Sequence, residues 1–225
     1  MRIREPFLMF GLVLFAVTGA DSQTATESHS RIGVSAGMGV SYVDPFDVVD
    51  LVNSTPGAVE RVPQFKAGVE FFGTANVPVS PEWSLKFEYA YFLASYNTGT
   101  VLGPAEYTLM YHLPSVIIQY LLLDAGVYNV RVGAGVGYHV GILERKFFTE
   151  DDQYTGSGIG SVADLEANTA FGEHLYAYLG ANLRWEFVGD LKNNGGLAPG
   201  VTPAGGRPTL HLFGVGARLG FTYYF

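Results

Sequence analysis

Apolar residues recur at every second position through most of the chain that follows residue 31. In residues 31–42 every even position from Ile32 to Tyr42 is apolar, and the positions between them are Arg, Gly or Ser. Successive side chains of a strand point to opposite faces, so this alternation predicts a β-strand with one apolar face. The pattern predicts seven further strands at 65–77, 83–97, 107–122, 129–140, 158–170, 175–187 and 210–225.

The segments between these strands alternate in length. Long loops, rich in Gly, Pro and acidic residues, are expected at 43–63, 97–106, 144–157 and 189–208, and short turns join the other strand pairs. An even number of strands, with short turns at one end and longer loops at the other, is the layout of outer-membrane barrels. The sequence therefore predicts an all-β protein, an eight-stranded antiparallel up-and-down transmembrane β-barrel with both termini on the short-turn side.

The segment 107–122 departs from regular alternation. Its apolar positions are odd-numbered from Tyr107 to Leu113 and even-numbered from Val116 onward, and Pro114 lies at the change. Proline cannot donate to the hydrogen-bonded ladder and is found at bulges, so we expect a one-residue bulge at Pro114 and Ser115. In that register Leu113 faces outward, and Ser115 and Ile117 face inward.

Charged residues decide which face of the barrel is inside, because a lipocalin has the same alternation with its apolar face inward. The apolar face of the predicted strands carries no charge, and the polar face carries six basic and five acidic residues among many glycines. Such near balance indicates an ion-pair network in a narrow lumen, and we prefer the membrane barrel to the lipocalin. The expected lumenal network consists of Arg31, Lys66, Glu70, Lys86, Glu88, Arg131, Asp164, Glu166, Arg184, Glu186 and Arg218.

Both ends of the chain support export to an outer membrane. Residues 1–20 combine Arg2 and Arg4, a short apolar run and a small-residue exit, which is typical of a cleaved signal peptide. Residues 21–30 are then a short periplasmic segment, and residues 31–225 form the barrel domain. The chain ends in an aromatic strand that resembles the C-terminal assembly signal of outer-membrane barrels, and the residues that match it are Arg218, Gly220, Tyr223 and Phe225.

Composition limits the partners of the protein. Hydrophobic residues make up 48% of the chain and charged residues 15%, there is no cysteine, and the formal net charge is −8. The negative charge argues against nucleic acid as a partner. We expect contacts with outer-membrane lipid, with lipopolysaccharide and with the barrel assembly machinery, in a bacterial outer membrane with periplasmic termini.

The centre of the sequence resembles a known family. The stretch from His112 through Leu113 and Pro114 to Gln119 and Tyr120, followed by the glycine-alternating strand that begins at Arg131, is similar to the OmpW family of small outer-membrane barrels. The remaining strands resemble the broader OmpA-like barrel group equally well. The OmpW resemblance implies passage of small apolar compounds into or across the membrane.

The predicted size of the barrel limits how such passage could occur. Eight strands enclose an interior that side chains fill, so a wide pore is excluded. A lateral opening near the expected bulge would avoid the filled lumen, with Leu113, Pro114, Ser115 and Ile117 as its candidate residues.

Two other classes of function stay open. An enzymatic barrel needs a nucleophile and a base close together, and His112, His139, His174 and His211 show no spacing typical of catalysis. We therefore predict no enzyme activity, no cofactor and no metal site, and we interpret His139 as a hydrogen-bonded core residue. The alternative to transport is a structural or surface-interaction barrel that acts through its extracellular loops.

Overall fold

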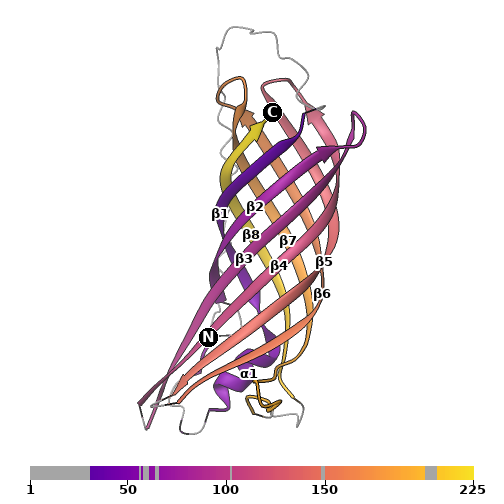
Figure 1. Ribbon diagram of the computed structural model, residues 1–225. Coiled ribbons are helices and arrows are strands. Elements are labelled where there is room, and N and C mark those ends of the chain that lie inside the picture. The colour runs from indigo at the N-terminus through magenta and orange to yellow at the C-terminus, as the bar shows by residue number, and fades with distance from the viewer. Residues whose placement is uncertain are drawn as a thin grey trace, which may run out of the picture.

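The computed structural model describes residues 31–55, 57, 61–63, 66–101, 103–147, 150–200 and 207–225. The predicted signal peptide, residues 1–20, and the segment 21–30 lie outside the described residues. Eight antiparallel strands follow one another in sequence order and close into a barrel (Figure 1). The strands are β1 (Gly33–Asp44), β2 (Lys66–Pro78), β3 (Trp83–Thr100), β4 (Gly103–Asp124), β5 (Tyr128–Phe147), β6 (Glu150–Ala170), β7 (Leu175–Asp190) and β8 (Thr209–Tyr224).

The predicted fold class is confirmed. The last strand closes the ring on the first, from the pair Gly33 and Tyr224 to the pair Asp44 and Phe213. Closure leaves no open sheet edge at the level of these pairs, as a strand protein in lipid requires. The end of the barrel where Gly33 and Tyr224 lie, drawn at the top of Figure 1, is called the terminus end below, and the opposite end is called the α1 end.

Two of the predicted long loops are wrong, because the central strands are longer than the sequence suggested. The strands β3 to β6 contain 18, 22, 20 and 21 residues. Pairing runs on to Thr100 and Gly103 in one hairpin and to Phe147 and Glu150 in the other, so most of the predicted loops 97–106 and 144–157 is strand. Glycines and acidic residues in these segments resemble loop residues, but here they occupy paired strands.

The bulge predicted at Pro114 and Ser115 is also wrong. The β3–β4 pairing runs through Pro114 without a shift, and the β4–β5 register is the same before Leu113 and after Pro114, although these two residues have no pair on β5. The register shift between β4 and β5 lies instead at Leu121 and Leu123. Consequently the odd positions of β4 from Ala105 to Gln119 face inward, and the side chains of Tyr107, Leu109, Tyr111 and Leu113 point into the barrel rather than outward.

The outward face of β3 to β6 changes from apolar to polar along the barrel axis. Adjacent outward residues form rows across the four strands, and the row that begins with Trp83 and Tyr120 continues with Val132 and Leu165. The last row with apolar members includes Leu93, Met110 and Ile142, and the next includes Ser95, Thr108, Glu144 and Gln153. Ten residues of tilted strand separate Trp83 from Leu93, a height of about 25 Å, which is the apolar band of a membrane barrel.

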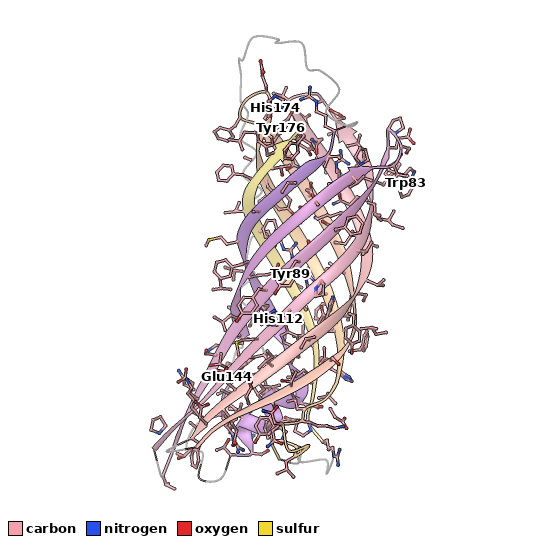
Figure 2. The ribbon with its side chains drawn as sticks, in the orientation of Figure 1. Trp83, Tyr89, His112, Glu144, His174 and Tyr176 are labelled. Atoms are coloured by element: carbon pink, nitrogen blue, oxygen red, sulfur yellow. The ribbon has the colours of Figure 1, made fainter. Side chains whose placement is uncertain are left out.

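Figure 2 shows these levels, with Trp83 near the terminus end, Tyr89 and His112 about midway, and Glu144 toward the α1 end. Beyond the apolar band the four central strands continue as an extension with a polar outer face. The next outward row contains Asn97, Glu106, Lys146 and Asp151. The extension therefore stands in water when the band lies in a bilayer.

A short helix, α1 (Phe46–Asn53), occupies part of the predicted loop 43–63. It lies across the α1 end of the barrel (Figure 1), and its buried residues are Val48, Val49, Leu51 and Val52. Among the described residues no helix has the length and apolarity needed to cross a membrane. The spacing of these four residues is helical, so the sequence contained a signal for α1 that the loop prediction overlooked.

Candidate functional site: the barrel interior

The interior is divided along its axis into two layers of different chemistry. The buried charged and amide side chains lie mainly in the half toward the terminus end, with Tyr176, Tyr224 and Ile117 among them, and aliphatic and aromatic side chains fill the half toward α1. Along the inward positions of β4, Gln119, Ile117 and Ser115 lie on the polar side, and Leu113 and Tyr111 follow on the apolar side. The layers are called the polar layer and the apolar chamber below.

Arg218 of β8 is the centre of the polar layer. Its Nε lies 2.5 Å from Glu70 Oε1, and its Nη1 lies 2.7 Å from Glu88 Oε2. Arg184 of β7 also pairs with Glu88, and the Arg218 guanidinium lies 4.9 Å from the centre of the Phe72 ring. These pairs join β2 and β3 to β7 and β8 across the barrel.

Lys86 of β3 forms the second cluster of the polar layer. Its ammonium lies 2.7 Å from Asp164 Oδ2 and 2.9 Å from Glu166 Oε2, both on β6. Gln119 donates to Glu166 Oε2 at 3.0 Å, and Asn76 donates to Gln119 Oε1 at 2.6 Å. The two clusters touch, because Lys86 Nζ is 3.8 Å from Glu88 Oε2.

A Ser–His–Glu chain lies where the polar layer meets the apolar chamber. Ser115 Oγ is 3.1 Å from His139 Nε2, and His139 Nδ1 contacts Glu186 Oε2. All three side chains are buried, and His139 is 0% exposed. The order of the three residues resembles a catalytic relay, and because all three side chains are buried we interpret the chain as a link between β4, β5 and β7. Glu186 depends on it, because its nearest cation, Arg184 Nη1, is 3.9 Å away.

Glycines on β5 and β6 make room for this chain. A Cβ atom on Gly160 would overlap Glu186 Oε2 and His139 Nδ1, and one on Gly137 would overlap the Pro114 carbonyl and His139 Nε2. A Cβ on Gly133 would come within 2.6 Å of Asp164 Oδ1. The glycine alternation of β5 therefore creates the space that the lumenal side chains of neighbouring strands occupy.

The apolar chamber is closed at the α1 end by the helix itself. Val48 and Val52 are 0% exposed, and they belong to one buried cluster with Leu109, Leu143 and Leu210. Asp47 Oδ2 accepts hydrogen bonds from Thr209 N at 2.9 Å and from Thr209 Oγ1 at 2.6 Å. A further bond of 2.7 Å joins Thr55 Oγ1, just after the helix, to the Tyr107 hydroxyl. The helix therefore plugs the chamber through apolar contacts and a few polar bonds.

Two cavities lie near the boundary between the polar layer and the apolar chamber. The inner one, about 10 Å³, holds at most one water and is bordered by Tyr111, Leu113 and Arg184 among others. The outer one is an open groove of about 670 Å³ on the barrel surface, lined by Asp44, Phe46, Trp185, Glu186, Phe187, His211, Leu212 and Phe213. Glu186 and Leu212 border both cavities.

Some of the buried polar atoms without a hydrogen-bond partner lie at the inner cavity. They are Arg184 Nε and Nη1, Asn182 Nδ2 and Glu186 Oε1, and all three residues border the cavity. Buried polar groups are nearly always satisfied, by water where protein atoms are absent, so the cavity is suited to one bound water.

Of the eleven residues expected in the lumenal network, the structure buries nine inside the barrel. Arg31 precedes β1 and is only partly buried. Lys66 begins β2 near α1, where its ammonium lies 5.6 Å from the centre of the Tyr96 ring, away from the polar layer. The nine that lie inside are Glu70, Lys86, Glu88, Arg131, Asp164, Glu166, Arg184, Glu186 and Arg218.

The other predicted site residues are dispersed. Leu113, Ser115 and Ile117 are buried inside the barrel, and Pro114 faces outward between paired strands, so these four do not line a common opening. Of the predicted assembly signal, Arg218 faces inward and Tyr223 and Phe225 are exposed, with their ring centres 5.0 Å apart. Within the described residues, no group of three or more acidic or histidine side chains could hold a metal ion.

Sequence reasoning missed the residues of the groove and the plug. Trp185, Phe187 and Phe213 were assigned only to an outward apolar face, and Phe46 lay in a predicted loop. Tyr107, which the predicted register places on the outward apolar face, is 3% exposed inside the barrel.

Comparison with known proteins shows the fold of the chain and no closer relationship. No protein-family model matches the sequence, and no curated protein matches it. Among solved structures, Ail, the attachment invasion locus protein of Yersinia pestis, has a TM-score of 0.53 at 11% identity, over 88% of this chain and 99% of that one. Neisserial surface protein A gives 0.52 at 11% identity, over 86% and 97% of the two chains.

The outer membrane protein OprG from Pseudomonas aeruginosa gives a TM-score of 0.50 at 13% identity, over 90% of this chain and 99% of that one. All three are small outer-membrane proteins whose fold this chain shares. At such low identity the likeness extends to the eight-stranded barrel and not to a common activity.

Proposed function

We propose that the protein is an integral barrel of a bacterial outer membrane that admits small apolar solutes to its apolar chamber and releases them sideways into the membrane. Its termini lie on the periplasmic side, and α1 lies on the outer side. One observation carries the proposal: the interior is apolar in the half toward α1 and filled by ion pairs in the other half.

The division of the interior favours a lateral route over a continuous pore. A solute that crossed the polar layer would have to displace the pairs that Arg218 makes with Glu70 and Glu88, and uncompensated buried charges are costly. Release into the hydrocarbon of the membrane needs no such step. An apolar solute gains about 25 cal/mol for each Å² of its surface that leaves water, which favours both the chamber and the bilayer.

Uptake by intact cells tests this function. The rate at which 1-aminoanthracene, an apolar fluorophore, enters a Gram-negative host should rise when the protein is produced and fall toward that of the empty host for Leu113→Asn. Thr108→Asn, on an outward polar row of the same strand, is the matched control and should keep the rate. Equal rates for producing and empty hosts would rule out the transport proposal.

A second candidate function rests on the extension of β3 to β6. Outward charges such as Glu106, Lys146 and Asp151 lie beyond the apolar band, where they can contact lipopolysaccharide or another surface. A triple variant, Glu106→Gln, Lys146→Gln and Asp151→Asn, separates the two functions, because it should leave fluorophore uptake unchanged and alter only surface binding.

We also propose that the barrel assembly machinery recognises the last strand. Tyr223 and Phe225 stand exposed at the outer side of the β1–β8 seam, on the terminus end, where a docking surface could reach them. The exposed aliphatic and aromatic side chains of the band are then in contact with outer-membrane lipid.

A further inference from the structure

The barrel wall changes its construction where β8 passes α1. β1 ends at Asp44, opposite Phe213, while β8 continues for four more residues to Thr209. Side chains take over from the missing strand there, since Thr209 N donates to Asp47 and the Leu210 carbonyl accepts a 2.8 Å bond from the Tyr111 hydroxyl. The seam between β8 and α1 is therefore closed by side-chain bonds and apolar packing rather than by a backbone ladder.

The surface groove lies against this seam. Phe46, the first residue of α1, borders it on one side, and Trp185 and Phe213 border it on the other, with their ring centres 5.2 Å apart. Buried Leu212 and Glu186 lie between the groove and the inner cavity and border both. A shift of α1 would thus join the outer surface of the barrel to the chamber without breaking a strand pair.

The side chains of α1 show what the chamber accepts. Val48, Val49, Leu51 and Val52 occupy it in the closed state, and they are branched aliphatic groups packed among leucines, valines and tyrosines. A guest of similar size and polarity can replace them when the helix moves, because an apolar space is filled with little loss by groups of equal volume.

We propose that the groove and the chamber form a single binding site, closed by α1, which a small neutral apolar molecule enters sideways through the β8–α1 seam. This inference rests on the proposed function and specifies its route and gate. The seam thereby takes the place of the opening first expected at Pro114, where β4 stays paired with β3.

The charges at the seam select among apolar guests. Glu186 and Asp44 border the groove, so an anionic guest such as an aromatic carboxylate is repelled. Glu186 Oε1 has no hydrogen-bond partner in the protein, and it can accept a hydrogen bond from a hydroxyl group of a guest that displaces the water of the inner cavity. The site therefore favours neutral apolar molecules with a hydroxyl group, such as a phenol or an alkanol, over carboxylates of equal size.

The sequence offers a direct probe of the seam, because the chain has two tryptophans and no cysteine. Trp185 borders the groove, whereas Trp83 lies next to Tyr120 near the terminus end. The variant Trp83→Phe therefore leaves Trp185 as a single fluorescence reporter at the seam. Trp185→Phe leaves Trp83 as the matched reporter for quencher dissolved in the lipid. In either background, Asp47→Cys with Thr209→Cys places two thiols where the Asp47–Thr209 bonds now hold α1.

The experiment measures how 4-bromophenol and 4-bromobenzoate quench tryptophan fluorescence of the protein in lipid nanodiscs at neutral pH. Each measurement is made first with the cysteine pair reduced and then with the pair joined, either by oxidation to a disulfide or by a short bifunctional thiol-reactive crosslinker. We expect 4-bromophenol to quench Trp185 saturably in the reduced protein, with an affinity at least about tenfold weaker once α1 is locked. Quenching of Trp83 should not depend on the lock. Migration of unboiled protein in SDS confirms that each variant is folded.

The outcomes separate this inference from the proposed function. Equal, saturable quenching of Trp185 in the locked and reduced protein would overturn the gate, and preference for 4-bromobenzoate would overturn the assigned guest class. If fluorophore uptake is absent in cells as well, the proposed function itself fails. If cells take up the fluorophore normally but the crosslink between α1 and β8 does not change quenching of Trp185, only the proposed route through the seam is rejected.

Discussion

At the scale of single residues, one arginine joins strands that are far apart in the sequence. Arg218 pairs with Glu70 and Glu88, which precede it by 148 and 130 positions. Its side chain is 2% exposed, and it lies in the part of the barrel that the apolar band surrounds. If Arg218 were replaced by a neutral residue, the carboxylates of Glu70 and Glu88 would be only partly compensated in a water-poor interior. Uncompensated buried charges lower the free energy of unfolding.

We therefore expect Arg218→Met to lower the free energy of unfolding by about 3–5 kcal/mol. Lys66→Met, which removes a half-buried cation near the α1 end, should cost less than about 1 kcal/mol. Urea unfolding in lipid vesicles, followed by tryptophan fluorescence, measures both. Removing the charge of Glu70 together with that of Arg218 should recover part of the loss, because Glu88 still pairs with Arg184, and a double variant less stable than Arg218→Met would contradict this account.

Glycine positions show how closely the residues inside the barrel are fitted. Gly160 has no space for a methyl group because Glu186 and His139 lie against it, whereas a Cβ on Gly73 would meet one backbone oxygen at 4.0 Å. Both residues occur in the same kind of alternating strand, so only the structure distinguishes the glycine that is needed from the one that is not.

At the scale of elements, alternation located all eight strands but misjudged their lengths. The polar outer face of the extension resembles loop sequence, because its outward residues meet water once the strands leave the apolar band. The predicted bounds place the end of each strand where the alternating apolar residues end. Strands need not do so when neighbouring strands continue to pair beyond the membrane.

The register of β4 was misread for a related reason. Its inward face is polar near Gln119 and apolar near Leu109, and the outward face at those levels is apolar and then polar. The exchange of polarity between faces looks in the sequence like a one-residue slip at Pro114. Most of the charged network could be predicted, because a charged side chain on a strand that crosses the apolar band must face the lumen rather than lipid. The groove and the plug depend on where β1 ends, which alternation does not show.

The helix α1 should separate from the barrel without unfolding it. Val52→Asp places a carboxylate at a 0% exposed position in the chamber, so the helix should leave while the strand pairs stay. We expect trypsin to cleave after the exposed Arg61 several-fold faster, with the free energy of unfolding of the barrel changed by less than about 1 kcal/mol. Val101→Asp, at an exposed turn position, is the control and should cleave at the original rate.

At the scale of the whole molecule, the barrel is closed and its interior is filled. A closed hydrogen-bonded ring resists SDS until it is heated, so unboiled protein from outer membranes should migrate faster than boiled protein. In planar bilayers we expect no stable conductance steps of the size that wide porins give, since the polar layer blocks the lumen. Large, long-lived steps from the purified protein would refute a blocked lumen.

The ion pairs of the polar layer also constrain the order in which the barrel forms. Arg218 and Arg184 lie on the last two strands, and their carboxylates Glu70 and Glu88 lie on β2 and β3. These charges cannot meet until the final strands arrive, so a sheet that has inserted but not closed carries unmatched charges in the membrane. Half-closed states are thereby penalised, and we expect the last hairpin to join the barrel in one cooperative step.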